Sequence, residues 1–194
     1  MLPRLGSSKL ISTWIWITIA ASIAGVLSHT VAGWLALAPA QIWRGEVWRL
    51  VTWVFVEPGP LALILTCASV YRFGGELAPR WGEHRLRRFL IEILGGTAVA
   101  TTLLALVSAD VWRAHYLGGW AVGDVLVIAW ARQYPDAVLP LYGLVQLSGR
   151  NLISVVLAIT CVYALFVGPL AMVPELLACA AAYSYPGAWL ARRT

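Results

Sequence analysis

Two carboxyl side chains, Asp124 and Glu175, lie inside long apolar stretches of the sequence. A carboxylate is costly in such surroundings, so it is usually either functional or held as a neutral, hydrogen-bonded structural group. Two interpretations stay open: the pair lines a hydrophilic cavity that accepts polar segments of another protein, or each carboxyl is structural. A two-carboxylate aspartyl protease is a third, and no motif of that chemistry flanks either residue.

Nucleophilic catalysis finds little support in the sequence. A serine, threonine or cysteine nucleophile needs a base within hydrogen-bond reach. The segment 111–147, which surrounds Asp124, contains no serine, threonine or cysteine, and His29, His84 and His115 fall at the boundaries of apolar stretches. The cysteines Cys67, Cys161 and Cys179 are odd in number and lack metal-ligand spacing. We therefore expect no catalytic residue, metal site or cofactor.

Composition indicates the environment of these residues. Of the 194 residues, 60% are hydrophobic and 12% are charged, whereas soluble domains average about 25% charged residues. This excludes a soluble enzyme and a nucleic-acid-binding module, and no nucleic-acid partner is expected. The chain is predicted to be an all-α polytopic membrane protein. Its expected partners include the lipids of the membrane that surrounds it.

Six stretches approach the ~20 apolar residues that a bilayer-crossing helix needs. They run near residues 10–28, 58–73, 89–107, 116–131, 152–167 and 170–191. Neither a repeat nor a linker is visible, so residues 1–194 are predicted to form one domain.

The basic residues predict the orientation of these six helices. With both termini in the cytoplasm, three basic residues face outward: Arg44, Arg49 and Arg113. Eleven face inward: Arg4, Lys9, Arg72, Arg80, Arg85, Arg87, Arg88, Arg132, Arg150, Arg192 and Arg193. This distribution follows the positive-inside rule.

The connection between the first two stretches, residues 29–57, is long and not polar. Apolar residues recur there at helical spacing, namely Trp43, Val47, Leu50, Val51 and Val54, with Arg44, Trp48 and Arg49 on the adjoining flank. Three charges in mid-segment exclude a crossing helix. We predict an amphipathic interfacial loop in which Trp43 and Trp48 lie at headgroup depth and Arg44 and Arg49 reach lipid phosphates.

Small residues four apart, Gly119 with Gly123 and Ala178 with Ala182, indicate close packing of the fourth and sixth helices.

Several blocks of the chain resemble a known superfamily. Trp48-Arg49 in an amphipathic first loop, together with the stretch 73–90, resembles the rhomboid superfamily; the glutamate of the rhomboid turn falls on Ala78, with Glu76 two residues earlier. Within that superfamily, the segments 47–55 and 129–135 and the Tyr185-Pro186 ending are similar to derlins. The resemblance implies a six-transmembrane-helix rhomboid-like bundle.

The same resemblance locates the positions of the rhomboid catalytic dyad. The serine position falls on Trp120, and the histidine position falls near Glu175. The chain is therefore identified as a rhomboid pseudoprotease, which is not an enzyme.

The resemblance to derlins also implies a function. Like derlins, the chain would bind transmembrane or misfolded client proteins and ease their lateral passage by thinning the membrane locally. A cytosolic AAA-type ATPase is a possible further partner. The alternatives are a static adaptor for a partner membrane protein and an intramembrane enzyme that uses Asp124 and Glu175. The expected location is the bacterial inner membrane, or the endoplasmic reticulum if the chain is eukaryotic.

Overall fold

The computed structural model describes residues 8–141 and 145–186, and most of them are helical. Helix α1 spans Lys9–Leu27. A second continuous helix consists of α5 (Pro60–Ser69), the π-helical turn η2 (Val70–Gly74) and α6 (Gly75–Trp81). Gly82, with a φ of 79°, reverses the chain into a third helix. That helix consists of α7 (Glu83–Leu90), the π-helical turn η3 (Ile91–Gly95) and α8 (Gly96–Leu104).

After the short helix α9 (Ala109–Arg113), the second half of the described chain forms three longer helices. Helix α10 spans Gly119–Gln133, α11 spans Gly149–Val167, and α12 spans Val173–Ser184 after the 3-10 turn η4 (Pro169–Met172). Each predicted stretch thus has a helical counterpart, although the second and third helices extend well past their predicted cytoplasmic ends. The last predicted stretch reaches residue 191, and its end lies outside the described residues.

Three of these helices are long and apolar enough to cross a membrane: Lys9–Leu27, Pro60–Trp81 and Gly149–Val167. The apolar helix Pro169–Ser184 is shorter, and the crossing helix predicted over 116–131 is the 15-residue α10. Six crossings therefore remain a prediction.

The first loop differs from the single amphipathic helix that the spacing of its apolar residues predicts. It consists of α2 (His29–Leu35), α3 (Pro39–Ile42), α4 (Arg49–Thr52) and the 3-10 turn η1 (Trp53–Phe55). Gly45 has a φ of 104°, which ends helical geometry between α3 and α4. The predicted apolar face is consequently divided, with Val51 at the surface and Val54 in the core.

The bundle also contains a β-hairpin, so the prediction of a purely α-helical chain was wrong in this segment. Strands β1 (Val138–Leu141) and β2 (Val145–Ser148) pair antiparallel between α10 and α11. Gly149 N–H donates to the Ala137 carbonyl oxygen at 3.0 Å, which closes the base of the hairpin. The side chain of Ser148 then caps the start of α11 by accepting from Asn151 N–H at 3.4 Å.

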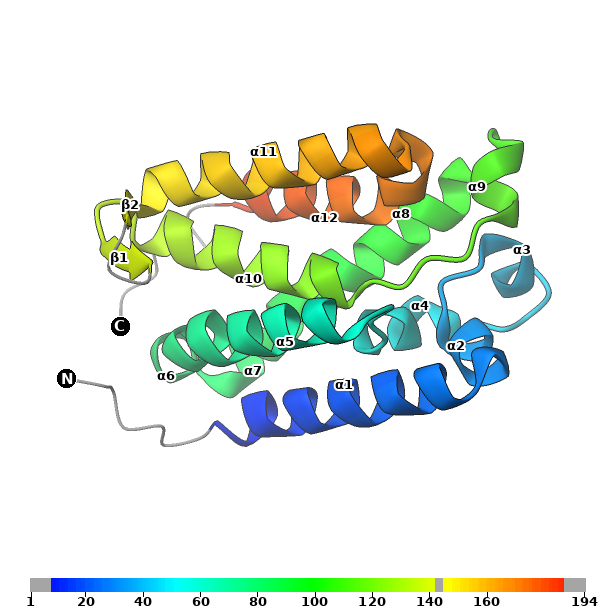
Figure 1. Ribbon diagram of the computed structural model, residues 1–194, viewed down its shortest axis with the longest axis horizontal. Helices are drawn as coiled ribbons and strands as arrows, with labels where there is room; N and C mark the ends of the chain where they lie inside the picture. The colour runs from blue at the N-terminus through cyan, green and yellow to red at the C-terminus, as the bar shows by residue number, and fades with distance from the viewer. Residues whose placement is uncertain (1–7, 142–144, 187–194) are drawn as a thin grey trace.

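Helix α10 is the centre of the molecule. It packs against α5 on one side and against α11 and α12 on the other, while α1 covers α5 at the periphery (Figure 1). Every residue from Ala121 to Ala131 is buried. Because α10 is enclosed by neighbouring helices, its polar residues lie inside the protein.

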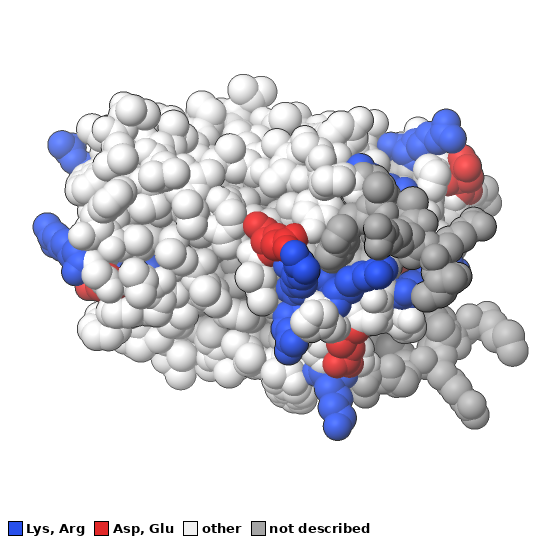
Figure 2. Space-filling model, turned by 180° about the vertical axis from the view of Figure 1, so that it is seen from behind, with Lys and Arg blue, Asp and Glu red and all other residues white. Residues whose placement is uncertain are grey.

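On the face shown in Figure 2, one group of charged side chains lies at one end of the long axis, and a second extends from the other end to the middle of the face. A largely uncharged belt separates the two groups. A belt of this kind is the surface that a bilayer-embedded protein presents to hydrocarbon.

Gly149 provides a stability test of the junction between the hairpin and α11. A β-carbon there would overlap the carbonyl oxygen of Tyr134 and lie 3.0 Å from that of Ala131, and neither backbone atom can rotate away. Gly149→Ala should destabilise the protein by about 2 kcal/mol or more. Gly75→Ala is the matched control, since no atom lies within 4 Å of its added carbon. Denaturant unfolding in detergent micelles compares the two, and equal stabilities would contradict this account of the junction.

Candidate functional site

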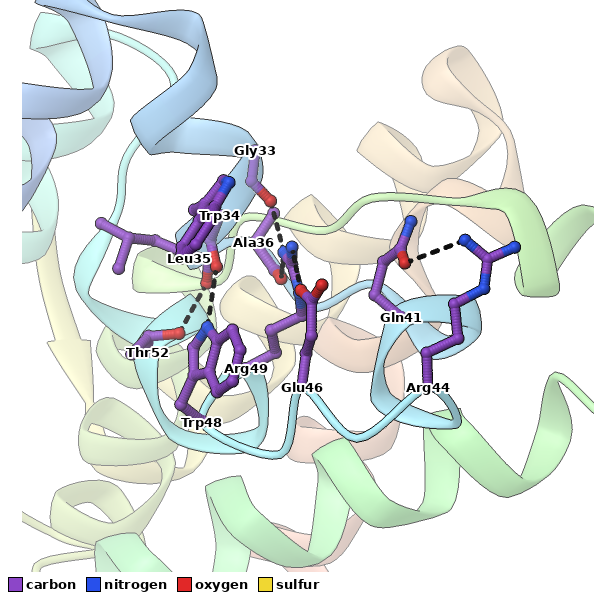
Figure 3. Close-up of polar contacts among 10 residues, drawn as sticks. All are labelled: Gly33, Trp34, Leu35, Ala36, Gln41, Arg44, Glu46, Trp48, Arg49 and Thr52. Atoms are coloured by element: carbon purple, nitrogen blue, oxygen red, sulfur yellow. Dashed lines mark hydrogen bonds and ion pairs between the residues drawn. The ribbon is translucent and has the colours of Figure 1, made fainter.

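The first loop is organised around the carboxyl end of α2. The last four carbonyl groups of a helix have no partner within it. Here the carbonyls of Gly33, Trp34, Leu35 and Ala36 all accept hydrogen bonds from side chains of the segment 48–52 (Figure 3).

Arg49 supplies the largest share of this cap. One guanidinium nitrogen donates to the carbonyls of Gly33 and Ala36, the latter at 3.0 Å. The Nη2 atom pairs with the Glu46 carboxylate at 2.6 Å, and Arg49 is only 4% exposed. A cation at this position also meets the negative end of the helix dipole.

Trp48 and Thr52 complete the cap. The indole N–H of Trp48 donates to the Trp34 carbonyl at 3.3 Å, and the two indole rings stack with centroids 6.0 Å apart. The Thr52 hydroxyl donates to the Leu35 carbonyl at 2.8 Å. The Trp48-Arg49 pair is therefore a structural clamp that fixes the first loop against α2.

This clamp corrects one prediction about the loop. Arg49 was expected to reach lipid phosphates, but its guanidinium is buried and committed to backbone carbonyls. Arg44 is exposed and donates a hydrogen bond to Gln41 Oε1 at 3.4 Å. Trp43 is half exposed and donates to the Thr102 carbonyl at 3.4 Å. Location of Trp43, Arg44 and Trp48 in the lipid interface stays a prediction.

Asp124 lies in the core of the bundle on α10. Its Oδ2 atom accepts from the Thr160 hydroxyl of α11 at 3.0 Å and lies 3.6 Å from Cys179 Sγ of α12. One carboxyl group thus connects the three helices at the centre of the molecule. Of the interpretations that the sequence left open, this placement fits the one in which the Asp124 carboxyl is a hydrogen-bonded structural group.

Glu175 lies one helical turn before Cys179 on α12 and is 4% exposed. Its Oε2 atom has no hydrogen-bond partner among the described residues. Both Asp124 and Glu57 lie within electrostatic range of Glu175. The described residues nevertheless contain no group of three His, Cys, Asp or Glu side chains arranged to hold a metal ion.

Glu57 is a third buried carboxyl, which sequence reasoning did not select. It accepts a hydrogen bond from the Thr66 hydroxyl, and its backbone N–H donates to Ser22 Oγ at 3.0 Å. Burial raises the pKa of Glu57 to about 7, against the opposing effect of the Thr66 hydrogen bond. The sequence signal was weak because Glu57 stands just outside an apolar stretch, in a Pro- and Gly-rich turn.

The two positions of the catalytic dyad are not arranged for hydrolysis. Trp120, at the serine position, is half-buried in the first turn of α10, and Glu175, at the histidine position, has no nucleophile among its described hydrogen-bond partners. Cys179 is the thiol beside Asp124, but it is 2% exposed, and buried thiols in apolar surroundings are inert. The arrangement therefore favours a non-catalytic site.

The small residues of α10 and α12 serve different contacts. Gly119 faces the Glu57 carboxylate, and a β-carbon at Gly123 would lie 3.5 Å from Ser69 Cβ on α5. Ala178 and Ala182 are fully buried, and α12 packs against α10. Close approach at the two glycines therefore serves the α5 side of α10.

Comparison with known proteins identifies relatives of this chain. The family described as "Eukaryotic integral membrane protein (DUF1751)" matches residues 8–190. Derlin-1 of Oryza sativa subsp. japonica is 31% identical over 103 residues, which cover 53% of this chain and 41% of the rice protein. Derlin-1 of Arabidopsis thaliana is 29% identical over 153 residues, which cover 78% of this chain and 54% of the relative.

These relatives confirm the predicted resemblance to derlins. The chain spans about half the length of the curated relatives it matches. The expectation of a bacterial inner membrane is not supported, because the matching family is eukaryotic and the similar derlins come from plants.

The clamp on α2 predicts unequal roles for two neighbouring arginines. Arg49→Ala leaves two carbonyls and the Glu46 carboxylate without their donor, and should cost about 3 kcal/mol or more of unfolding free energy. Arg44→Ala removes an exposed side chain and should change it by less than about 0.5 kcal/mol. Thermal unfolding in micelles is the measurement. A loss of stability in both variants alike would refute the clamp.

The geometry around α10 predicts no peptide-bond hydrolysis. The purified protein should leave a transmembrane rhomboid substrate intact and should not react with a fluorophosphonate, because Trp120 and Glu175 occupy the dyad positions and the thiol of Cys179 beside Asp124 is buried. Gel analysis and mass spectrometry detect both events. Covalent labelling of any serine of this chain, or cleavage that persists after repurification, would contradict the prediction.

Proposed function

Because the chain belongs to the DUF1751 family of eukaryotic integral membrane proteins, we propose that it is a non-catalytic, derlin-like protein of endoplasmic reticulum quality control. It binds transmembrane or misfolded client proteins and eases their lateral passage through the bilayer. Similarity to plant derlins, and Trp120 and Glu175 at the positions of the rhomboid serine and histidine, support this proposal.

The observation that carries the proposal is the place of Arg72 on the second helix. Arg72 follows the first helical residue, Pro60, by 12 positions, and its side chain is 45% exposed. At 1.5 Å per residue, the uncharged part of this helix spans about 18 Å, well short of the ~30 Å hydrocarbon core. An exposed charge belongs at headgroup level. Snorkelling of the long arginine side chain toward the headgroups makes up part of the difference between the uncharged length of the helix and the thickness of the core.

The helix itself is not short, since it continues to Trp81. The mismatch arises because Arg72, Glu76 and Arg80 occupy its last turns. Mismatch costs a fraction of a kcal/mol per ångström, so a deficit of about 12 Å, reduced in part by snorkelling, amounts to a few kcal/mol. Lipid beside α5 thins in response, and a client helix with polar residues crosses the thinner layer at lower cost.

Bilayer thickness around the protein tests this function. Cryo-EM of the protein in nanodiscs should show a smaller headgroup separation beside α5 than far from the protein. The double variant Arg72→Leu, Glu76→Gln extends the uncharged stretch to Arg80, 20 positions after Pro60, or about 30 Å. We expect it to restore normal thickness locally and to slow client passage.

Arg113→Leu, in the other charged end, is the control and should leave the thinned region unchanged. A belt of normal thickness around the unmodified protein would contradict the proposal. Client capture by such a protein would instead indicate a static adaptor.

A further inference from the structure

A cavity of about 380 Å³ opens at the end of the bundle where α6, the last turns of α10 and strand β1 meet. Its polar wall consists of Arg72, Glu76 and Arg80, and its aromatic wall consists of Trp130 and Tyr134. Ala137, Val138 and Leu139 form the remaining side. The polar wall belongs to the charged turns that set the proposed mismatch, whereas the aromatic wall and strand β1 take no part in the proposed client handling. None of the buried carboxyls Glu57, Asp124 and Glu175 is among the described lining residues.

The aromatic wall is anchored in the core by ring contacts. Trp130 is 3% exposed and contacts Phe73 edge to face, with ring centroids 5.5 Å apart. Its ring centroid lies 5.3 Å from that of Tyr134. The guanidinium of Arg80 lies 4.9 Å from the centroid of the Tyr134 ring, which orients its N–H groups.

The polar wall carries an excess of positive charge. The Glu76 carboxylate is neutralised by Arg72 and also accepts a hydrogen bond from Trp130 Nε1. Among the residues that the structure describes, Arg80 has no carboxylate partner. The cavity therefore presents one uncompensated guanidinium beside an aromatic surface.

The location of the cavity indicates which kind of ligand it binds. It lies in the charged end of the molecule that holds both ends of the described chain (Figure 1), and the exposed apolar residue Val138 lines it. Tyr71, the exposed neighbour of Arg72 in the chain, extends the apolar surface. Basic cavities between helices at the edge of a bilayer bind the headgroups of anionic lipids. Guanidinium groups also match phosphate oxygens in a bidentate geometry.

We propose that this cavity binds the phosphate of an anionic membrane lipid. Arg80 donates to the phosphate oxygens, Arg72 adds a second positive charge, and the rings of Trp130 and Tyr134 contact the glycerol backbone. The acyl chains then lie along the exposed apolar residues beside the cavity. The lipid would link α6 to the hairpin segment at Val138.

Lipid retention tests the proposal. The probe is phosphatidylglycerol, incorporated with phosphatidylcholine into nanodiscs that contain the full chain, and native mass spectrometry measures the lipid that stays bound after release. The unmodified protein should retain phosphatidylglycerol in preference to phosphatidylcholine. Arg80→Gln should lower this retention about tenfold, whereas Arg87→Gln, an exposed arginine of the same end outside the cavity, should not change it.

Glu76→Gln provides a gain-of-binding arm that misfolding cannot imitate. Among the described residues of the wall, Glu76 supplies the only carboxylate, and this substitution removes it while the amide oxygen can still accept from Trp130. We expect retention of phosphatidylglycerol to increase. Equal retention of both lipids, or the same loss in Arg87→Gln, would overturn the proposal. Displacement of the bound lipid by soluble glycerol phosphate would assign the cavity to a free phosphate ligand and would overturn it too.

Discussion

A helix that ends within an apolar protein must find donors for its last carbonyl groups, and two arginines meet this requirement at opposite ends of the molecule. Arg49 covers the end of α2 and thereby positions the whole first loop. Arg132 of α10 donates to the carbonyls of Ala182 and Tyr185 at 2.9 and 2.7 Å, at the end of α12. Charge-assisted bonds of this kind contribute about 1.5–3 kcal/mol each. Without them the short helices would leave polar backbone exposed to hydrocarbon.

Sequence reasoning located the helices but not the roles of these arginines. Apolar stretches of sufficient length identify a helix in any context, so each of the six has a counterpart. Arg132 was counted only as a topological charge, and Arg49 was also expected to reach lipid phosphates, because residue type does not reveal which carbonyls lack partners. The first loop satisfied helical spacing over residues 43–54, yet the positive φ of Gly45 divides it. Periodicity does not detect a single glycine that breaks a helix.

The buried carboxyls show the same limit. Asp124 and Glu175 were found because they interrupt apolar stretches, whereas Glu57 stands beside one. The partners of Asp124, Thr160 and Cys179, lie 36 and 55 residues away in the chain. Contacts between residues so far apart in the chain cannot be predicted without the fold.

The hairpin was missed because its strands have only four residues each, and a proline such as Pro140 within an apolar run usually argues against a strand.

The π-helical turns η2 and η3 allow the second and third helices to hold one extra residue each without turning away from their neighbours. Each turn contains one residue more than an α-helical turn would hold, and in a regular α-helix that residue would turn everything after it by about 100°. Deletion of a single residue in Val70–Gly74 would restore regular geometry and leave Glu76 and Arg80 facing as they do now relative to α5. Sequence alignments of relatives should therefore admit one-residue gaps in these two segments. A chain with such a gap would retain both the bundle and the direction of its charged flank.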